Sequence, residues 1–175
     1  SAAISLGSEY ALTADDTLGD FSYWMLDGKI LGYTPTITVR GMYDLTLTAV
    51  YDETVDPVPV ISLVDAFGQM NGEKYAMSFV ALRSVPEGWT VGEHGVLYTT
   101  RDDLTGLDLQ EVMVLNGTGI KTSKSSVTDR IGVYVFTANA TRALTIHVRG
   151  YMTLTRDGVT VTFYSDEILE QSYAP

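Results

Sequence analysis

The carboxylate side chains are the most numerous groups in this sequence that could do chemistry, and 11 of the 22 acidic residues fall into four clusters. A glycosidase needs only two carboxyl groups flanking the glycosidic bond, so acid–base chemistry of this kind has to be considered. Spacing along the chain does not fix the distance between two carboxylates across a sheet, and most acidic residues are exposed to solvent. We therefore interpret the clusters as solvated turns and linker. They are Asp15, Asp16 and Asp20; Asp52, Glu53 and Asp56; Asp102, Asp103 and Asp108; and Asp166 with Glu167.

One of these clusters has the composition of a calcium-binding loop. Ca²⁺ takes oxygen ligands, and the stretch RDDLTGLDL offers several from one loop. The stretch lacks the DxDxDG order of the known calcium loop motif. A structural calcium ion bound by Asp102, Asp103 and Asp108 is therefore one expectation, and no other cofactor is expected.

Residues for nucleophilic or zinc chemistry are scarce. The chain has two histidines, His94 and His147, and no cysteine. Glu93 precedes His94, but adjacent strand residues point to opposite faces, so this pair makes a poor metal site. His147 has apolar neighbours on both sides of a strand pattern, which indicates a structural or solvent-facing histidine. The sequence contains neither HExxH nor a serine in a GxSxG elbow, and we expect that the protein is not an enzyme.

Aromatic side chains are the best candidates for a binding surface. An exposed tryptophan or tyrosine on a sheet can stack on a sugar ring, while polar neighbours bind the hydroxyl groups. Trp89 follows Pro-Glu-Gly in an apparent loop and is the strongest candidate, although all of these residues are also ordinary strand or core residues. The candidate ligand-binding residues are Trp89, Tyr98, Tyr151, Tyr33 and Trp24.

Composition narrows the class of protein. The 175 residues include 22 acidic and 11 basic ones, and the net charge of −11 would repel nucleic acid and anionic lipid. No apolar run approaches the roughly 20 residues of a membrane-spanning helix, so we expect no membrane insertion. The acidity is typical of solubility outside the cell. Because the chain starts without Met and ends on QSYAP, we expect a monomeric segment of a longer protein.

The hydrophobic pattern predicts an all-β protein. Five stretches alternate β-branched or aromatic residues with polar ones, which is the period-2 pattern of half-buried strands. Asp157-Gly158 is the strongest turn signal, because both central residues of a type I′ turn need positive φ; Asp27-Gly28 and Asn71-Gly72 are weaker signals. The best helical candidates are short pieces near RDDLTGLDLQ and the tail DEILEQS. The strand stretches are PTITVRG, DLTLTAVYD, RIGVYVFTA, ALTIHVRGYMTLT and VTVTFYS.

One boundary divides the chain. The stretch YDETVDPVPVI, residues 51–61, combines three acidic residues with two prolines, which favours a stiff, extended linker or an entry strand. We therefore predict a small β-repeat-like module at residues 1–56 and an antiparallel β-sandwich at residues 57–175.

The first part resembles bacterial surface-protein repeats of the Listeria-Bacteroides type. Those repeats have an aromatic-x-x-Trp stretch, a glycine turn, a short strand and a closing strand, and YALTA at residues 10–14 matches the strand before it. The resemblance implies that Trp24 packs in the core. The matching residues are Phe21, Trp24, Gly28, Leu45, Thr46, Ala49 and Tyr51.

The second part resembles immunoglobulin-like or fibronectin-III-like sandwich modules of surface proteins from gut Firmicutes. The stretches that carry the resemblance are residues 77–100 and 146–168. It implies that the EHGVLYT and VRGYMTL strands share one sheet and that the YSD strand follows by a hairpin. Lys-Asn or Lys-Asp isopeptide crosslinks occur in such sandwiches, but their motifs are not visible here.

Together these features predict a non-catalytic, extracellular or cell-wall-attached module of a larger bacterial surface protein. It would act as a structural spacer or as an adhesive unit that binds a surface protein. The alternative is a carbohydrate-binding module that recognises a polysaccharide through exposed aromatic residues. A fold shared by so many functions cannot decide between the two.

Overall fold

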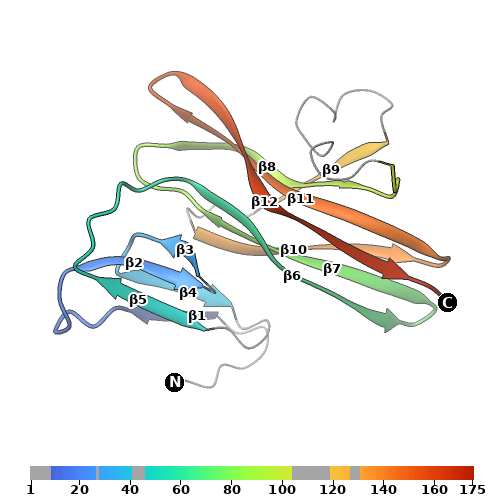
Figure 1. The fold of residues 1–175 in the computed structure, drawn as a ribbon, viewed down its shortest axis with the longest axis horizontal. Coiled ribbons are helices and arrows are strands. Elements are labelled where there is room, and N and C mark those ends of the chain that lie inside the picture. Colours follow the sequence, from blue (N-terminus) through green and yellow to red (C-terminus); the bar gives the residue numbers. More distant parts are fainter. Residues whose placement is uncertain (1–8, 27, 41–45, 104–118, 127–130) are drawn as a thin grey trace.

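The computed structural model describes residues 9–26, 28–40, 46–103, 119–126 and 131–175. Within these ranges the chain forms twelve β-strands (Figure 1), so the predicted all-β class is confirmed. The described residues include no helix that is long and apolar enough to span a membrane.

The first five strands form two small antiparallel sheets. One sheet pairs β1 (Glu9–Thr13) with β4 (Thr36–Arg40). The other places β2 (Phe21–Leu26) between β3 (Lys29–Gly32) and β5 (Leu47–Tyr51). We call these strands the N-terminal part.

The remaining strands form a β-sandwich of two antiparallel sheets. The first sandwich sheet has the order β10-β7-β6, and the second has the order β12-β11-β8-β9. The EHGVLYT and VRGYMTL stretches therefore lie in one sheet, as β8 and β11, and the YSD stretch follows in β12. The bounds are β6 Val60–Asn71, β7 Lys74–Ser84, β8 Thr90–Thr99, β9 Ile120–Lys124, β10 Ile131–Ala140, β11 Leu144–Arg156 and β12 Val159–Tyr173.

The hairpin between β11 and β12 has the turn that its sequence predicts. Arg156 pairs with Val159 across a two-residue loop. Asp157 and Gly158 have φ values of 52° and 76°, as a type I′ turn requires. Gly28 and Gly72 also take positive φ, at 83° and 62°, in the turns between β2 and β3 and between β6 and β7.

The helical prediction for the tail DEILEQS is wrong, because these residues continue β12. Leu169 and Tyr173 pack into the sandwich core, whereas Ile168 belongs to a cluster with Leu97 and Tyr151. The tail therefore alternates between two apolar environments with the period of a strand, and the long strand β11 supplies its hydrogen-bonding partner. Most of the other helical candidate, near RDDLTGLDLQ, lies outside the described residues.

The N-terminal part shares a hydrophobic cluster with the sandwich. Trp24 is 6% exposed and Leu82, on β7, is fully buried in the same cluster. Val64 on β6 and Val133 on β10 pack against this cluster as well. The core position expected for Trp24 is therefore confirmed, and the N-terminal part covers one face of the first sandwich sheet. The division of the chain near residue 56 stays a prediction.

Substitution of Gly158 by alanine is expected to destabilise the protein by about 1–2 kcal/mol, because a Cβ at positive φ clashes with the backbone. The measurement is the free energy of unfolding in urea. Asp157→Asn is the matched control, since asparagine tolerates positive φ at the neighbouring position. Equal stabilities of the two variants would contradict the turn assignment.

Candidate functional site

A cleft of about 410 Å³ lies where the N-terminal part meets the sandwich. Tyr33 and Thr34 come from the turn after β3, and Pro57 comes from the connection to β6. The opposite wall is built by the last residue of β7, the segment after it and the end of β11. The residues of that wall are Ser84, Val85, Pro86, Glu87 and Arg156.

Tyr33 is held in place by hydrogen bonds to the connection between the two parts. The backbone N–H of Val58 donates to the Tyr33 hydroxyl at 3.2 Å, and that hydroxyl lies 3.5 Å from the Val58 carbonyl oxygen. Its ring meets the ring of Tyr23 edge to face, with centroids 6.5 Å apart. Tyr23 in turn donates to Glu53 at 2.7 Å, and this hydrogen bond raises the pKa of Tyr23. The aromatic wall of the cleft is therefore fixed before any ligand arrives.

Arg156 forms the charged wall and lies over the ring of Trp89, with its guanidinium carbon 5.7 Å from the ring centroid. Trp89 also meets Phe163 edge to face, with centroids 5.7 Å apart, and packs against the buried cluster of Ile61 and Met152. Its indole N–H is buried and finds no acceptor among the residues that the structure describes. Trp89 therefore supports Arg156 rather than offering a free face for stacking.

The cleft combines a tyrosine, two prolines and a valine with one positive and one negative side chain. Arg156 can bind a carboxylate or hydroxyl groups of a ligand, since its guanidinium has five donors. Its other neighbour, Asp157, lies 3.6 Å away and is exposed. This arrangement suits a small ligand with one apolar face and polar groups at its edge.

Three other aromatic candidates, Trp24, Tyr98 and Tyr151, do not line this cleft, and their rings pack against other residues of the protein. Trp24 is 6% exposed, and its indole N–H donates to the carbonyl of Pro35 at 3.2 Å. Tyr151 is 5% exposed and donates to Glu93 at 2.8 Å; burial and this hydrogen bond raise its pKa. Tyr98 packs in the sandwich core against Phe136 at a centroid distance of 4.7 Å. Among the five candidates, only Tyr33 lines the cleft directly.

Asp102 and Asp103, two of the three expected calcium ligands, contact different partners. Arg101 binds the carboxylate of Asp103 through its Nε atom at 2.9 Å, and Asp102 turns instead toward His147, at 3.5 Å from its Nε2 atom. Asp108 lies outside the described residues. Within the described ranges, no three histidine or acidic residues are grouped so that they could hold a metal ion.

His147 is a buried structural residue. It is 6% exposed, and its two ring nitrogens each lie 3.5 Å from a carboxylate, one of Asp102 and one of Glu170. Asp52, from one of the acidic sequence clusters, also has a structural role. Asp52 accepts from the backbone N–H of Asp20 at 3.0 Å, which fits a turn residue.

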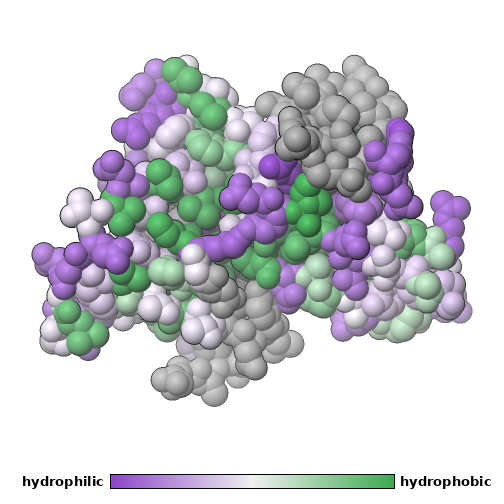
Figure 2. Space-filling view, in the orientation of Figure 1, coloured by the Kyte–Doolittle hydropathy of each residue, from purple (hydrophilic) through white to green (hydrophobic). Residues whose placement is uncertain are grey.

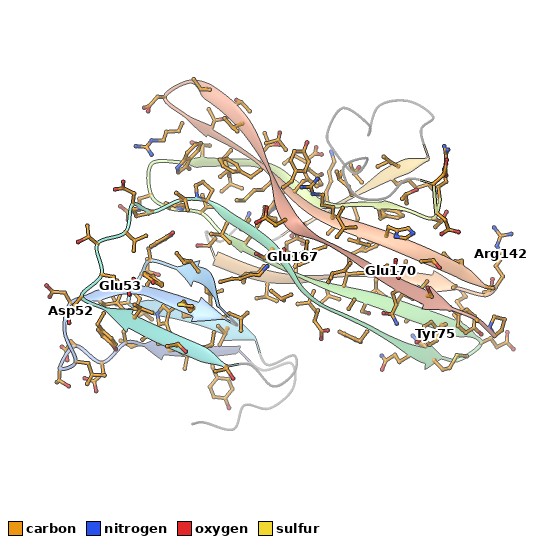
Figure 3. All side chains as sticks on the ribbon, viewed as in Figure 1. Asp52, Glu53, Tyr75, Arg142, Glu167 and Glu170 are labelled. Carbon is orange, nitrogen blue, oxygen red and sulfur yellow. The ribbon has the colours of Figure 1, made fainter. Side chains whose placement is uncertain are left out.

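Glu167 corrects the interpretation of its cluster as solvated. It lies within β12, forms an ion pair with Lys29 on β3, and its other oxygen is 3.4 Å from the backbone N–H of Leu63. Figure 3 shows Glu167 in the middle of the molecule, far from Asp52 and Glu53. Neither Lys29 nor Arg156 belongs to a sequence motif, so pattern analysis missed both.

No family model, curated protein or solved structure matches this chain. The resemblances to surface-protein repeats and to immunoglobulin-like modules therefore stay predictions.

The buried histidine His94 is expected to make stability depend on pH. It is 6% exposed, and burial, followed by the nearby positive charge of Arg83, lowers its pKa from 6.5 to about 4. Between pH 4 and pH 6.5, the unfolded chain therefore binds a proton at His94 that the folded chain does not bind. The contribution of neutral His94 to the free energy of unfolding is fully present above pH 6.5. It falls by on the order of 3 kcal/mol as the pH drops toward 4.

Unfolding in urea at several pH values from 7.5 to 4 measures this effect. The loss of stability on acidification is expected to be smaller in His94→Gln than in the wild type by that amount, because glutamine does not titrate. Parallel pH profiles of the two proteins would contradict the assignment.

Proposed function

We propose that this chain is a non-catalytic module of a larger extracellular bacterial surface protein, where it acts as a structural spacer or as an adhesive unit for a protein partner. The observation that carries the proposal is the hydrophobic cluster shared by Trp24 and Leu82. It joins the N-terminal part to the sandwich. A pulling force on one part would therefore be transmitted to the other.

The ion pair between Lys29 and Glu167 supports the same proposal. It links β3 of the N-terminal part to β12 of the second sandwich sheet. Glu167 is also close to the backbone of β6, so three segments meet at one carboxylate. Because both side chains are partly exposed, the pair adds specificity of orientation more than stability.

The surface charge is in keeping with an extracellular role. The net charge of −11 disfavours binding to nucleic acid and to anionic membranes. Hydrophilic and apolar residues are interspersed on the face shown in Figure 2, as expected for a solvated surface.

Truncation of Leu82 tests whether the shared hydrophobic cluster holds the N-terminal part and the sandwich together. Leu82→Ala is expected to reduce the free energy of unfolding by about 2–5 kcal/mol, because it opens a cavity between the two parts. The control is Val161→Ala, at a position 40% exposed on β12, which should change little. In the wild type, near-ultraviolet and far-ultraviolet circular dichroism should report one coincident unfolding transition. Two separate transitions would show that the parts are independent.

A second candidate function is carbohydrate binding, and the cleft between Tyr33 and Arg156 favours it. The test is retention of the purified chain on a panel of plant, host and microbial polysaccharides. For a structural module we expect no retention and no release of reducing sugar. Detectable hydrolysis would overturn the non-catalytic proposal.

Variants decide whether any retention comes from the cleft. Tyr33→Ala and Arg156→Ala should each lower retention at least tenfold if the cleft binds the sugar, since both walls contact the ligand. Leu18→Ala, at a residue 64% exposed that does not line the cleft, is the control. Retention that is equal in all variants would place the binding site elsewhere.

A further inference from the structure

The cleft between Tyr33 and Arg156 has a hydroxyl group on its floor. Ser84, the last residue of β7, lines the cleft although it is only 1% exposed. Its hydroxyl makes no hydrogen bond with any residue that the structure describes. A deeply placed hydroxyl without a partner costs free energy. A ligand that reaches the floor can remove this cost by forming a hydrogen bond with Ser84.

The apolar surface of the cleft is formed before a ligand binds. Val85 is 3% exposed, and Pro86 is buried beside it. On the facing wall, Tyr33 is partly exposed and is fixed by the hydrogen bond that its hydroxyl accepts from the N–H of Val58. An aromatic ring next to fixed apolar side chains suits the apolar face of a sugar ring.

Charged side chains of both signs border the same cleft. Arg156 and Glu87 line it together with Ser84. The guanidinium of Arg156 only donates hydrogen bonds, the carboxylate of Glu87 only accepts them, and the Ser84 hydroxyl can do both. Sugar hydroxyls also donate and accept. A neutral sugar ring can therefore satisfy all three side chains without bringing a charge into the cleft.

The charge of the protein disfavours an acidic sugar at this place. The net charge of −11 repels anionic chains in solution. At the cleft, the carboxylates of Glu87 and of Asp157, which lies 3.6 Å from Arg156, offset the single positive charge of that arginine. A carboxylate on the ligand would be repelled by these two side chains, whereas a hydroxyl group would not.

We propose that this cleft binds a neutral sugar residue of a glycan. The inference rests on the second candidate function, carbohydrate binding, and specifies the class of ligand. The apolar face of the ring lies against Tyr33 and Val85, and the ring hydroxyls bind Ser84, Arg156 and Glu87. The volume of about 410 Å³ is near the lower end of the range of small-ligand sites, ~300–1,000 Å³. The cleft therefore holds a short part of a glycan rather than a long segment.

Isothermal titration calorimetry with matched oligosaccharides tests the proposal. The probes are short oligomers of glucose, galactose and mannose, each beside the oligomer of its uronic acid. At least one neutral probe is expected to bind, and its acidic counterpart should bind at least tenfold more weakly, because its carboxylates are repelled. The affinity for the neutral probe should stay constant between about 0.05 and 0.5 M salt, since no charge of the ligand is screened.

Ser84→Ala is the sharpest variant, because it removes only the hydroxyl on the floor. Its affinity for the neutral probe should fall about fivefold, which is the effect of one lost hydrogen bond. Its free energy of unfolding in urea should not fall, since no described residue is hydrogen-bonded to this hydroxyl. An unchanged affinity would overturn the proposed floor of the site.

The charged wall is tested by a matched pair of arginine variants. Arg156→Ala should lower the affinity for the neutral probe at least tenfold, because it removes donors to the ring hydroxyls. Arg142→Ala is the control and should bind like the wild type. Arg142 is exposed, does not line the cleft and lies at the opposite end of the molecule from Asp52 and Glu53 (Figure 3). Equal affinities of the two variants would place the sugar elsewhere and overturn the proposal.

The outcomes also separate this inference from the function on which it rests. Binding of the acidic oligomers alone, weakened by Arg156→Ala, would support carbohydrate binding and overturn the neutral class of ligand. If none of the probes binds, the inference and the carbohydrate candidate both fail, and the structural role stands.

Discussion

The burial of β7 on both faces is the constraint on which the rest of the structure depends. Met77, Phe79 and Ala81 face the core between the two sandwich sheets. Leu82 faces the opposite way, into the cluster with Trp24, and Val80 is equally buried. Without the N-terminal part, the apolar residues on the outer face of β7 would lose their burial, and this exposure costs free energy. The N-terminal part is therefore a third layer of the same structure.

This layer explains which features could be predicted from the sequence and which could not. The Asp157-Gly158 turn is specified locally by positive φ, so its prediction did not need the rest of the fold. The tail of β12 depends on β11 for its partner and on two separate clusters for its burial. Its local composition of Glu, Leu and Gln favours a helix, and tertiary packing overrides that preference.

The candidate site could not be predicted from the sequence, because its residues come from segments that are far apart along the chain. Trp89 was predicted correctly as a residue near a loop, but its neighbours Arg156 and Phe163 come from the β11–β12 hairpin. A tryptophan that looks free for stacking in the sequence is thus covered in the fold. Tyr33 becomes part of a cleft only because the connection at Pro57 and Val58 returns to it. Spacing along the chain contains neither piece of information.

The same layered arrangement concentrates the connections to the N-terminal part on one side of the sandwich. Residues 52–59 carry the chain from the N-terminal part to β6, and β6 then lies beside β12, where Glu167 meets both Lys29 and Leu63. The ion pair and the connection therefore hold the N-terminal part at the β6–β12 side of the sandwich, while the shared apolar cluster holds it against the face of the first sheet.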